Sequence, residues 1–213
     1  MSDLASCFPA GARVFVAGSA NEPTALLQAL ADTPLPEGLH FIQFPLPGYN
    51  RTDFTRIAPQ AHMSTFFMTP DLREAEPGRL HFLPMQMRWV YDYLASDVDV
   101  ALIQVARSAD GRLCLGPNVD FTQAVLGCAK TVVAELNSAF VAPAGAVPIE
   151  EGRLDYVLES SRRLHEMPRP KIDEAADRIG ELVADLIEDG DCLQTGIGGI
   201  PAAILSRRET RTI

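Results

Sequence analysis

Short apolar runs alternate with amphipathic stretches along this chain, a pattern that is typical of an α/β protein. The run Val98–Ala106 is nearly continuous in apolar residues, as expected of a strand buried on both faces of a parallel sheet. Other runs have the length and composition of strands as well. The predicted strands are Arg13–Ala17, His40–Phe44, Arg79–Leu83, Val98–Ala106 and Thr131–Leu136.

Helical spacing of apolar residues predicts shorter helices at Thr24–Ala31, Met87–Ala95 and Val119–Ala129. The clearest helix runs from about Asp173 to Asp189, and Gly190 gives it a C-terminal stop. Its apolar stripe is expected to pack into a core. The stripe consists of Ile172, Ala175, Ala176, Ile179, Leu182, Val183, Leu186 and Ile187.

Two segments share one layout. A strand ends at Gly18 and Pro23 opens a helix; a strand at about Cys192–Thr195 ends at Gly196 and Pro201 opens a helix. An internal duplication would explain this likeness, and chance is the alternative because strand–glycine–helix turns are common. The polar segment 165–171 (HEMPRPK) holds two prolines and is the best candidate linker. We therefore divide the chain into residues 1–167 and 168–213.

Composition and charge narrow the classes of partner and compartment. The 213 residues carry 18 Lys and Arg against 28 Asp and Glu, a net charge of −10 that disfavours nucleic acid. The arginine cluster Arg207, Arg208 and Arg211 lacks interleaved aromatic residues. The four cysteines form no C-x-x-C pair, so no metal site is expected. Neither a signal peptide nor a membrane span is recognisable, which favours a cytoplasmic protein without a membrane partner.

The strongest local motif is Leu193–Pro201 (LQTGIGGIP), where glycines between a predicted strand and a helix allow close approach to an anionic ligand. It fits neither G-x-G-x-x-G nor a phosphate-binding loop, so a plain tight turn stays an alternative. Glu22 and Glu135 lie near strand ends, where α/β proteins build their sites, although helix caps often look the same.

The histidines give no ligand pattern. His40, His62, His81 and His165 have no metal-ligand spacing and are expected to be structural or at the surface.

Four stretches resemble the acetyl-CoA hydrolase/CoA-transferase family, which includes the 4-hydroxybutyrate, succinyl-CoA:acetate and propionate CoA-transferases. They are Val98–Asn137, Pro168–Leu205, Gly18–Pro23 and Phe66–Ala75. The resemblance implies an α/β fold: a CoA-transferase-type (NagB/RpiA-like) domain with a largely parallel sheet, followed by the truncated start of a second, related domain.

The resemblance also implies covalent chemistry on acyl-CoA and small carboxylates, with coenzyme A as part of the substrate and no metal. A glutamate attacks the acyl-CoA and ends as a glutamyl-CoA thioester. Gln194, Gly196 and Gly198 would lie beside that thioester and stabilise its oxyanion. The residues expected to contact CoA are Gly196, Ile197, Gly198 and Gly199, with Gly18 and Asn21 as weaker candidates.

One departure from the family bears on activity. The nucleophilic glutamate is expected beyond Ile213, because Glu209 follows the glycine loop too closely. We therefore expect an N-terminal part that needs the missing C-terminal half and is inactive alone. A non-catalytic module that binds CoA, a nucleotide or a partner protein is the alternative. A fragment stabilised only by self-association, as a homo-oligomer, is the third possibility. The acyl group, and the choice between transferase and hydrolase, stay open.

Overall fold

A computed structural model describes residues 3–167 and 169–209, apart from the side chains of Arg208 and Glu209. The chain divides into two compact units, Met1–Glu166 and Met167–Ile213, and each is described by itself. None of the helices in the described ranges has both the length and the apolar character needed to cross a membrane.

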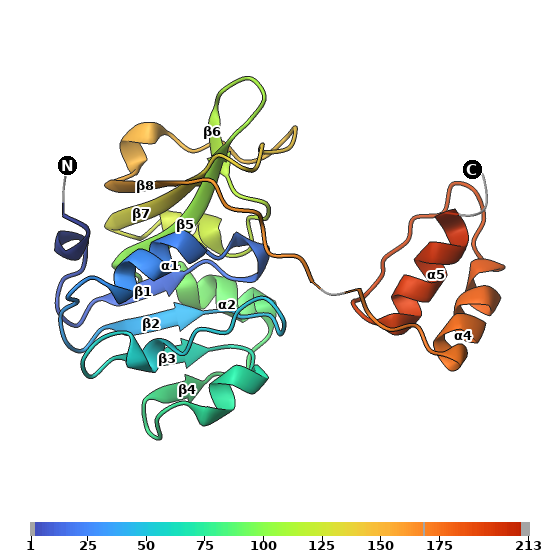
Figure 1. Cartoon of the computed structure of the whole chain (residues 1–213), viewed down its shortest axis with the longest axis horizontal. Helices are drawn as coiled ribbons and strands as arrows, with labels where there is room; N and C mark the ends of the chain where they lie inside the picture. The colour runs from blue at the N-terminus through green and yellow to red at the C-terminus, as the bar shows by residue number, and fades with distance from the viewer. Residues whose placement is uncertain (1–2, 168, 210–213) are drawn as a thin grey trace. The chain divides into compact units, whose positions relative to one another are not determined.

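Unit 1 is built around one sheet whose strands are parallel except for the β5–β6 pair (Figure 1). The order across the sheet is β4-β3-β2-β1-β5-β7-β8, and β6 pairs with β5 off this path. The strands are β1 (Arg13–Val16), β2 (His40–Gln43), β3 (His62–Thr65), β4 (Leu80–Phe82), β5 (Val100–Arg107), β6 (Leu113–Leu115), β7 (Thr131–Asn137) and β8 (Tyr156–Ser160).

The strand order contains a reversal. From β1 the chain runs outward through β2, β3 and β4, and then returns to place β5 on the other side of β1. Open parallel sheets bind ligands at such a switch point, at the carboxyl ends of the strands. The edge of the sheet between β1 and β5 is therefore where a site is expected.

Helices cover both faces of this sheet (Figure 1). Helix α1 (Thr24–Ala31) packs through Leu26, Leu27 and Leu30 on one face, while α2 (Met87–Leu94) and α3 (Thr122–Leu126) lie on the other. Successive residues of β5 alternate between the two cores, which explains its continuous apolar sequence. Short 3-10 helices join the elements, at Leu4–Cys7, Ser19–Asn21, Phe54–Arg56, Pro70–Glu74 and Glu151–Arg153.

The predicted strands and helices of unit 1 are present, with shifted ends. The helix predicted over Val119–Ala129 is reduced to α3, because the chain before it forms a loop that packs on the switch point. Three strands were missed: β3, β6 and β8. β3 has a polar sequence, β6 is short, and β8 exposes alternate residues at an edge, so their apolar signal is weak.

Unit 2 holds two helices, α4 (Glu174–Ala184) and α5 (Gly199–Glu209). They pack through small residues of α4: Ala176, Gly180 and Ala184 are buried. A Cβ on Gly180 would lie 2.8 Å from the Cβ of Ala203, so the two helices approach very closely.

The sequence prediction for unit 2 needs three corrections. The helix predicted to reach Asp189 ends at Ala184, with Asp185 as its C-cap. Its large apolar stripe is not the buried face: Leu182 is 54% and Leu186 78% exposed. The strand expected at Cys192–Thr195 is not formed, since unit 2 has no neighbouring strand in its described residues to pair with it.

Candidate functional site

Two loops meet at the switch point of the sheet: residues 18–22, which follow β1, and residues 116–121, which follow β6. We call them the switch-point loops. Each loop has a glycine at a position where a side chain would collide with a neighbouring segment. A Cβ on Gly18 would lie 2.2 Å from the carbonyl oxygen of Phe44, and one on Gly116 would lie 2.1 Å from Oδ1 of Asn21. Sequence analysis had pointed to Gly18 and Asn21, and the structure places both here.

Polar side chains hold the first switch-point loop in place. The Gly18 N–H donates to Oδ2 of Asp120 at 3.2 Å, and the Ser19 N–H donates to Oδ1 of Asn50 at 2.7 Å. The amide of Asn118 donates to the Ser19 hydroxyl. Ser19 and Asp120 both have positive φ angles, 48° and 31°, a conformation that non-glycine residues seldom adopt. Hydrogen bonds thus hold the two loops together.

Asn21 has an unsatisfied side chain. It is fully buried, and neither its amide nitrogen nor its amide oxygen has a hydrogen-bond partner within the described residues. Oδ1 of Asn118 and Oγ1 of Thr122, on the neighbouring loop and helix, are buried without a partner as well. Buried polar groups in native proteins are nearly always paired, so this cluster fits a place where a further polar group binds.

Two carboxyl groups at the switch point have raised pKa values. Burial raises the pKa of Glu22, while hydrogen bonds from Gln43 and Asn50 and the charge of Arg162 oppose the rise. Desolvation of its carboxyl group raises the pKa of Asp120 to about 7, against the effect of the Gly18 N–H. Both groups therefore favour their neutral form more than free carboxyl groups do.

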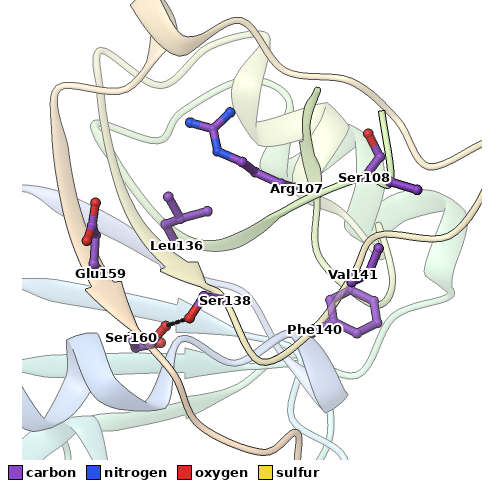
Figure 2. Close-up of a pocket in the computed structure, with 9 residues that line it drawn as sticks. Arg107, Ser108, Leu136, Ser138, Phe140, Val141, Glu159 and Ser160 are labelled. Atoms are coloured by element: carbon purple, nitrogen blue, oxygen red, sulfur yellow. Dashed lines mark hydrogen bonds between the residues drawn. The ribbon is translucent and has the colours of Figure 1, made fainter. Parts of the chain in front are cut away.

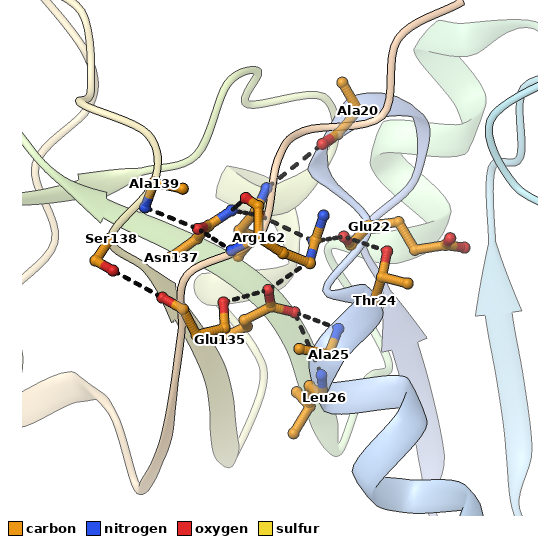
Figure 3. A network of polar contacts seen from close by, with 12 residues as sticks. Ala20, Glu22, Thr24, Ala25, Leu26, Glu135, Asn137, Ser138, Ala139 and Arg162 are labelled. Atoms are coloured by element: carbon orange, nitrogen blue, oxygen red, sulfur yellow. Dashed lines mark hydrogen bonds and ion pairs between the residues drawn. The ribbon is translucent and has the colours of Figure 1, made fainter.

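Glu135 organises a second cluster beside the switch-point loops (Figure 3). It is fully buried on β7, and its two carboxylate oxygens accept four hydrogen bonds. Oε2 accepts from the N–H groups of Ala25 and Leu26, at 2.8 and 3.3 Å, and so caps the N-terminus of α1. Oε1 accepts from the Ser160 hydroxyl at 2.7 Å and from Nε of Arg162 at 2.6 Å.

Arg162 joins this cluster to the first switch-point loop. Its Nη2 donates to the carbonyl oxygen of Glu22 at 2.6 Å and to Oε1 of Gln104 at 3.0 Å. Asn137 binds the Arg162 backbone, donating to its carbonyl at 2.9 Å and accepting from its N–H at 3.3 Å. Residues within or just after β1, β5, β7 and β8 are thereby held together at the carboxyl ends of these strands.

Sequence analysis found Glu22 and Glu135 but missed Arg162, Gln104 and Asn137. A signal existed in part: Gln104 is a polar residue inside an apolar strand, and Asn137 follows Glu135 on the same face of β7. Arg162 could not be found, because its strand β8 was not predicted.

A pocket of about 450 Å³ lies next to this cluster, at the carboxyl ends of β5, β7 and β8. Figure 2 shows Leu136 between Glu159 on one side and Phe140 on the other. The guanidinium of Arg107 at its rim is already bound, by the Glu151 carboxylate at 2.9 Å and the Gly111 carbonyl at 3.0 Å. Sequence analysis gave no indication of this pocket.

The glycine loop predicted to bind CoA lies in unit 2. Gln194, Gly196 and Ile197 belong to an irregular segment, Gly198 has a φ of 144°, and α5 begins at Gly199. Toward the described residues, the backbone N–H groups of residues 194–198 donate no hydrogen bond. The helix N-terminus and these N–H groups give the loop donors for an anionic oxygen.

Three histidines that the sequence did not connect lie together on neighbouring strands. The rings of His62 and His81 are stacked at 5.9 Å, and His40 lies 6.1 Å from His81. Burial, with the charges of Arg13 and the neighbouring histidines, lowers the pKa of His40 to about 4. Among the described residues, no cluster of metal-binding side chains was found.

Residues 1–166 match the acetyl-CoA hydrolase/transferase N-terminal domain. The chain belongs to this family. A succinyl-CoA:acetate/propanoyl-CoA:succinate CoA transferase from Fasciola hepatica is 32% identical over 205 residues, 92% of this chain and 43% of that protein. A 4-hydroxybutyrate coenzyme A transferase from Clostridium kluyveri is 33% identical over 203 residues, 91% of this chain and 46% of that protein. The chain thus spans less than half the length of these curated relatives.

Solved structures share the fold of this chain. RipA from Yersinia pestis superposes with a TM-score of 0.80 at 22% identity, covering 97% of this chain and 52% of that one. A 4-hydroxybutyrate CoA-transferase from Porphyromonas gingivalis superposes with a TM-score of 0.67 at 25% identity, covering 96% and 49%. The resemblance found in the sequence and the α/β fold class are both confirmed.

Proposed function

We propose that this chain is the N-terminal part of an acyl-CoA:carboxylate CoA-transferase or acetyl-CoA hydrolase that moves CoA between small carboxylic acids. The observation that carries the proposal is the likeness to relatives named as CoA transferases, which extends over more than 90% of the chain. Residues 1–167 would form the first domain, and residues 168–213 would begin the catalytic one.

The proposed reaction follows the chemistry implied by the family. A glutamate carboxylate attacks the acyl-CoA carbonyl, and the CoA thiolate leaves to give a mixed anhydride. The thiolate then attacks the glutamyl carbonyl, releases the first acid and forms the glutamyl-CoA thioester. A second carboxylate attacks the glutamyl-CoA thioester and expels the CoA thiolate, which then attacks the acyl carbonyl of the new mixed anhydride to give the new acyl-CoA and the free glutamate. In a hydrolase, water attacks the thioester instead and releases CoA and the free glutamate.

The glycine loop of unit 2 is proposed to stabilise the oxyanions of these steps. Gln194, Gly196 and Gly198 would lie beside the thioester, with Ile197 and Gly199 contacting CoA. This role is supported by the N–H groups of residues 194–198, which donate no hydrogen bond within the part of the chain that the structure describes. In unit 1, Gly18 and Asn21 are proposed to contact the substrate, which is supported by the unsatisfied amide of Asn21.

The nucleophile is proposed to lie outside residues 1–213. Two carboxylates of this chain were candidates, and both are engaged otherwise. Glu135 is saturated by four donors, and Glu22 is buried against Gln43 at 2.9 Å. A nucleophile needs a free oxygen lone pair and room for an acyl group. Neither carboxylate offers both.

An exchange assay tests this function. Residues 1–205 are fused to the remaining part of the Clostridium kluyveri relative, and acyl-CoA is incubated with labelled acetate or propionate. We expect label to enter the CoA esters with the fusion and not with the chain alone. A folded fusion without exchange for any acid, or robust exchange by the chain alone, would overturn the proposal.

A further inference from the structure

One terminal nitrogen of Arg162 has no partner among the residues that the structure describes. Its Nε binds Glu135, and its Nη2 binds the Glu22 carbonyl and Gln104. Nη1 makes no hydrogen bond or ion pair with any described residue, and in Figure 3 it carries no dashed line. The side chain is 19% exposed, and Nη1 is not one of the fully buried unpartnered side-chain atoms of the described residues.

Hydrogen bonds hold the other two nitrogens of the guanidinium in place, so Nη1 has a fixed position before any ligand binds. Contacts from β5, β7 and the loop after β1 fix both the side chain and the backbone of Arg162. A fixed guanidinium loses little conformational entropy when it binds a further group. Charge-assisted hydrogen bonds to carboxylates are among the strongest that proteins form.

The surroundings favour a small monoanion over a phosphate. Arg162 lies among acceptor oxygens of Gln104, Glu22 and Glu135, and the last of these forms an ion pair with it. These oxygens repel a phosphate dianion more strongly than a carboxylate. The charged groups facing Arg162 are Glu135, which pairs with it, and Glu22, whose carboxyl interacts with it electrostatically.

We propose that Nη1 of Arg162 binds the carboxylate of the small acid that exchanges CoA, at the carboxyl ends of β5 and β7. The identity of the acid rests on the proposed function, whereas binding needs no turnover. Arg162 then sets specificity for the acid and takes no part in covalent steps.

The test measures equilibrium binding of acetate, propionate, succinate and 4-hydroxybutyrate to the 213-residue chain by calorimetry. Arg162→Gln should weaken binding roughly tenfold or more, because a hydrogen bond to a charged group is lost. Arg162→Lys should weaken it less. Arg163→Gln, a change at the exposed neighbouring residue, serves as the matched control and should leave affinity unchanged.

Glu22→Gln should strengthen binding of the acids, whereas Arg162→Gln should weaken it. Glu22→Gln removes an acidic group near Arg162 while keeping an oxygen that can accept from Gln43, so the acids should bind more tightly at pH 8. A merely structural Arg162 would not produce this gain. It also keeps the proposal testable if Arg162→Gln fails to fold, which circular dichroism will show.

The inference is overturned if the wild-type chain binds none of the acids, if Arg162→Gln binds them as the wild type does, or if Glu22→Gln gives no gain. Inorganic phosphate and CoA are separate probes. Tighter, Arg162-dependent binding of phosphate would also contradict a carboxylate site. If the acids bind in an Arg162-dependent way but the fusion catalyses no exchange, the inference stands and the proposed function is wrong. If the fusion catalyses exchange but the acids do not bind in this way, the proposed function stands and the inference is wrong.

Discussion

At the scale of single residues, the switch point depends on glycines that no other residue can replace. In Gly18→Ala the new Cβ would meet the Phe44 carbonyl, which is backbone and cannot move aside. We expect a loss of about 1–3 kcal/mol in the free energy of unfolding, measured by urea denaturation. Gly152→Ala is the control, since no atom lies within 4 Å of its Cβ position. Equal stabilities of the two variants would contradict the packing described.

The buried carboxyl of Glu22 makes stability depend on pH. Its pKa in the folded chain is raised above the usual value of 4.5. The folded state therefore retains this proton more strongly than the unfolded state, and stability falls as pH rises from about 4.5 through the folded-state pKa. Glu22→Gln should lack this fall, so its advantage over the wild type grows from pH 5 to pH 8.

Denaturation at both pH values measures this difference. The exposed Glu37→Gln provides the matched control and should show the same pH dependence as the wild type. A constant difference between Glu22→Gln and the wild type would show that the Glu22 carboxyl is not buried as described.

Part of the site could be found from sequence at this scale. Gly18, Asn21, Glu22 and Glu135 were identifiable because each follows or ends a strand with a clear apolar pattern. Arg162 was not identifiable, because its position depends on β8. The residues that hydrogen-bond to it lie 25 to 140 positions away in the sequence. Long-range hydrogen bonds leave no periodic trace in a sequence.

At the scale of elements, burial decided what could be predicted. β5 is buried along nearly its whole length, and its apolar run gave the strand with little error. β8 alternates between half-buried and exposed residues at the sheet edge, so its sequence contains few apolar positions. The large apolar residues of α4 led to a wrong prediction of its buried face. The helix instead packs on α5 through its small residues, which allow the two helices to approach closely.

The close contact between α4 and α5 predicts that an alanine in place of a helix glycine destabilises unit 2. Replacing glycine by alanine within a helix normally stabilises it by about 0.5–1 kcal/mol. At Gly180 the added Cβ would meet Ala203, so Gly180→Ala should loosen α5 and speed amide hydrogen exchange there. Gly196→Ala has free space and should leave this exchange unchanged. Slower exchange in Gly180→Ala would contradict the close contact.

At the scale of the whole molecule, unit 2 presents apolar side chains to solvent. Ile179, Leu182 and Leu186 are 39%, 54% and 78% exposed. We expect this surface to drive self-association, which sedimentation velocity would detect as a concentration-dependent rise in mass. Leu182→Lys with Leu186→Lys should shift the chain toward monomer, whereas Glu174→Lys, at an exposed polar position of α4 outside the apolar stripe, should not. A wild-type chain that is monomeric at all concentrations would refute this expectation.

We propose that this chain is the first half of a CoA-transferase whose nucleophile lies outside residues 1–213. The most direct measurement is peptide mapping by mass spectrometry of the fusion with the Clostridium kluyveri relative after incubation with acyl-CoA. We expect a covalent CoA adduct on a glutamate outside residues 1–213. The adduct should be absent from the Gly198→Val variant of the fusion, which alters the glycine loop. An adduct on Glu22 or Glu135, or no adduct in a folded fusion, would contradict this proposal.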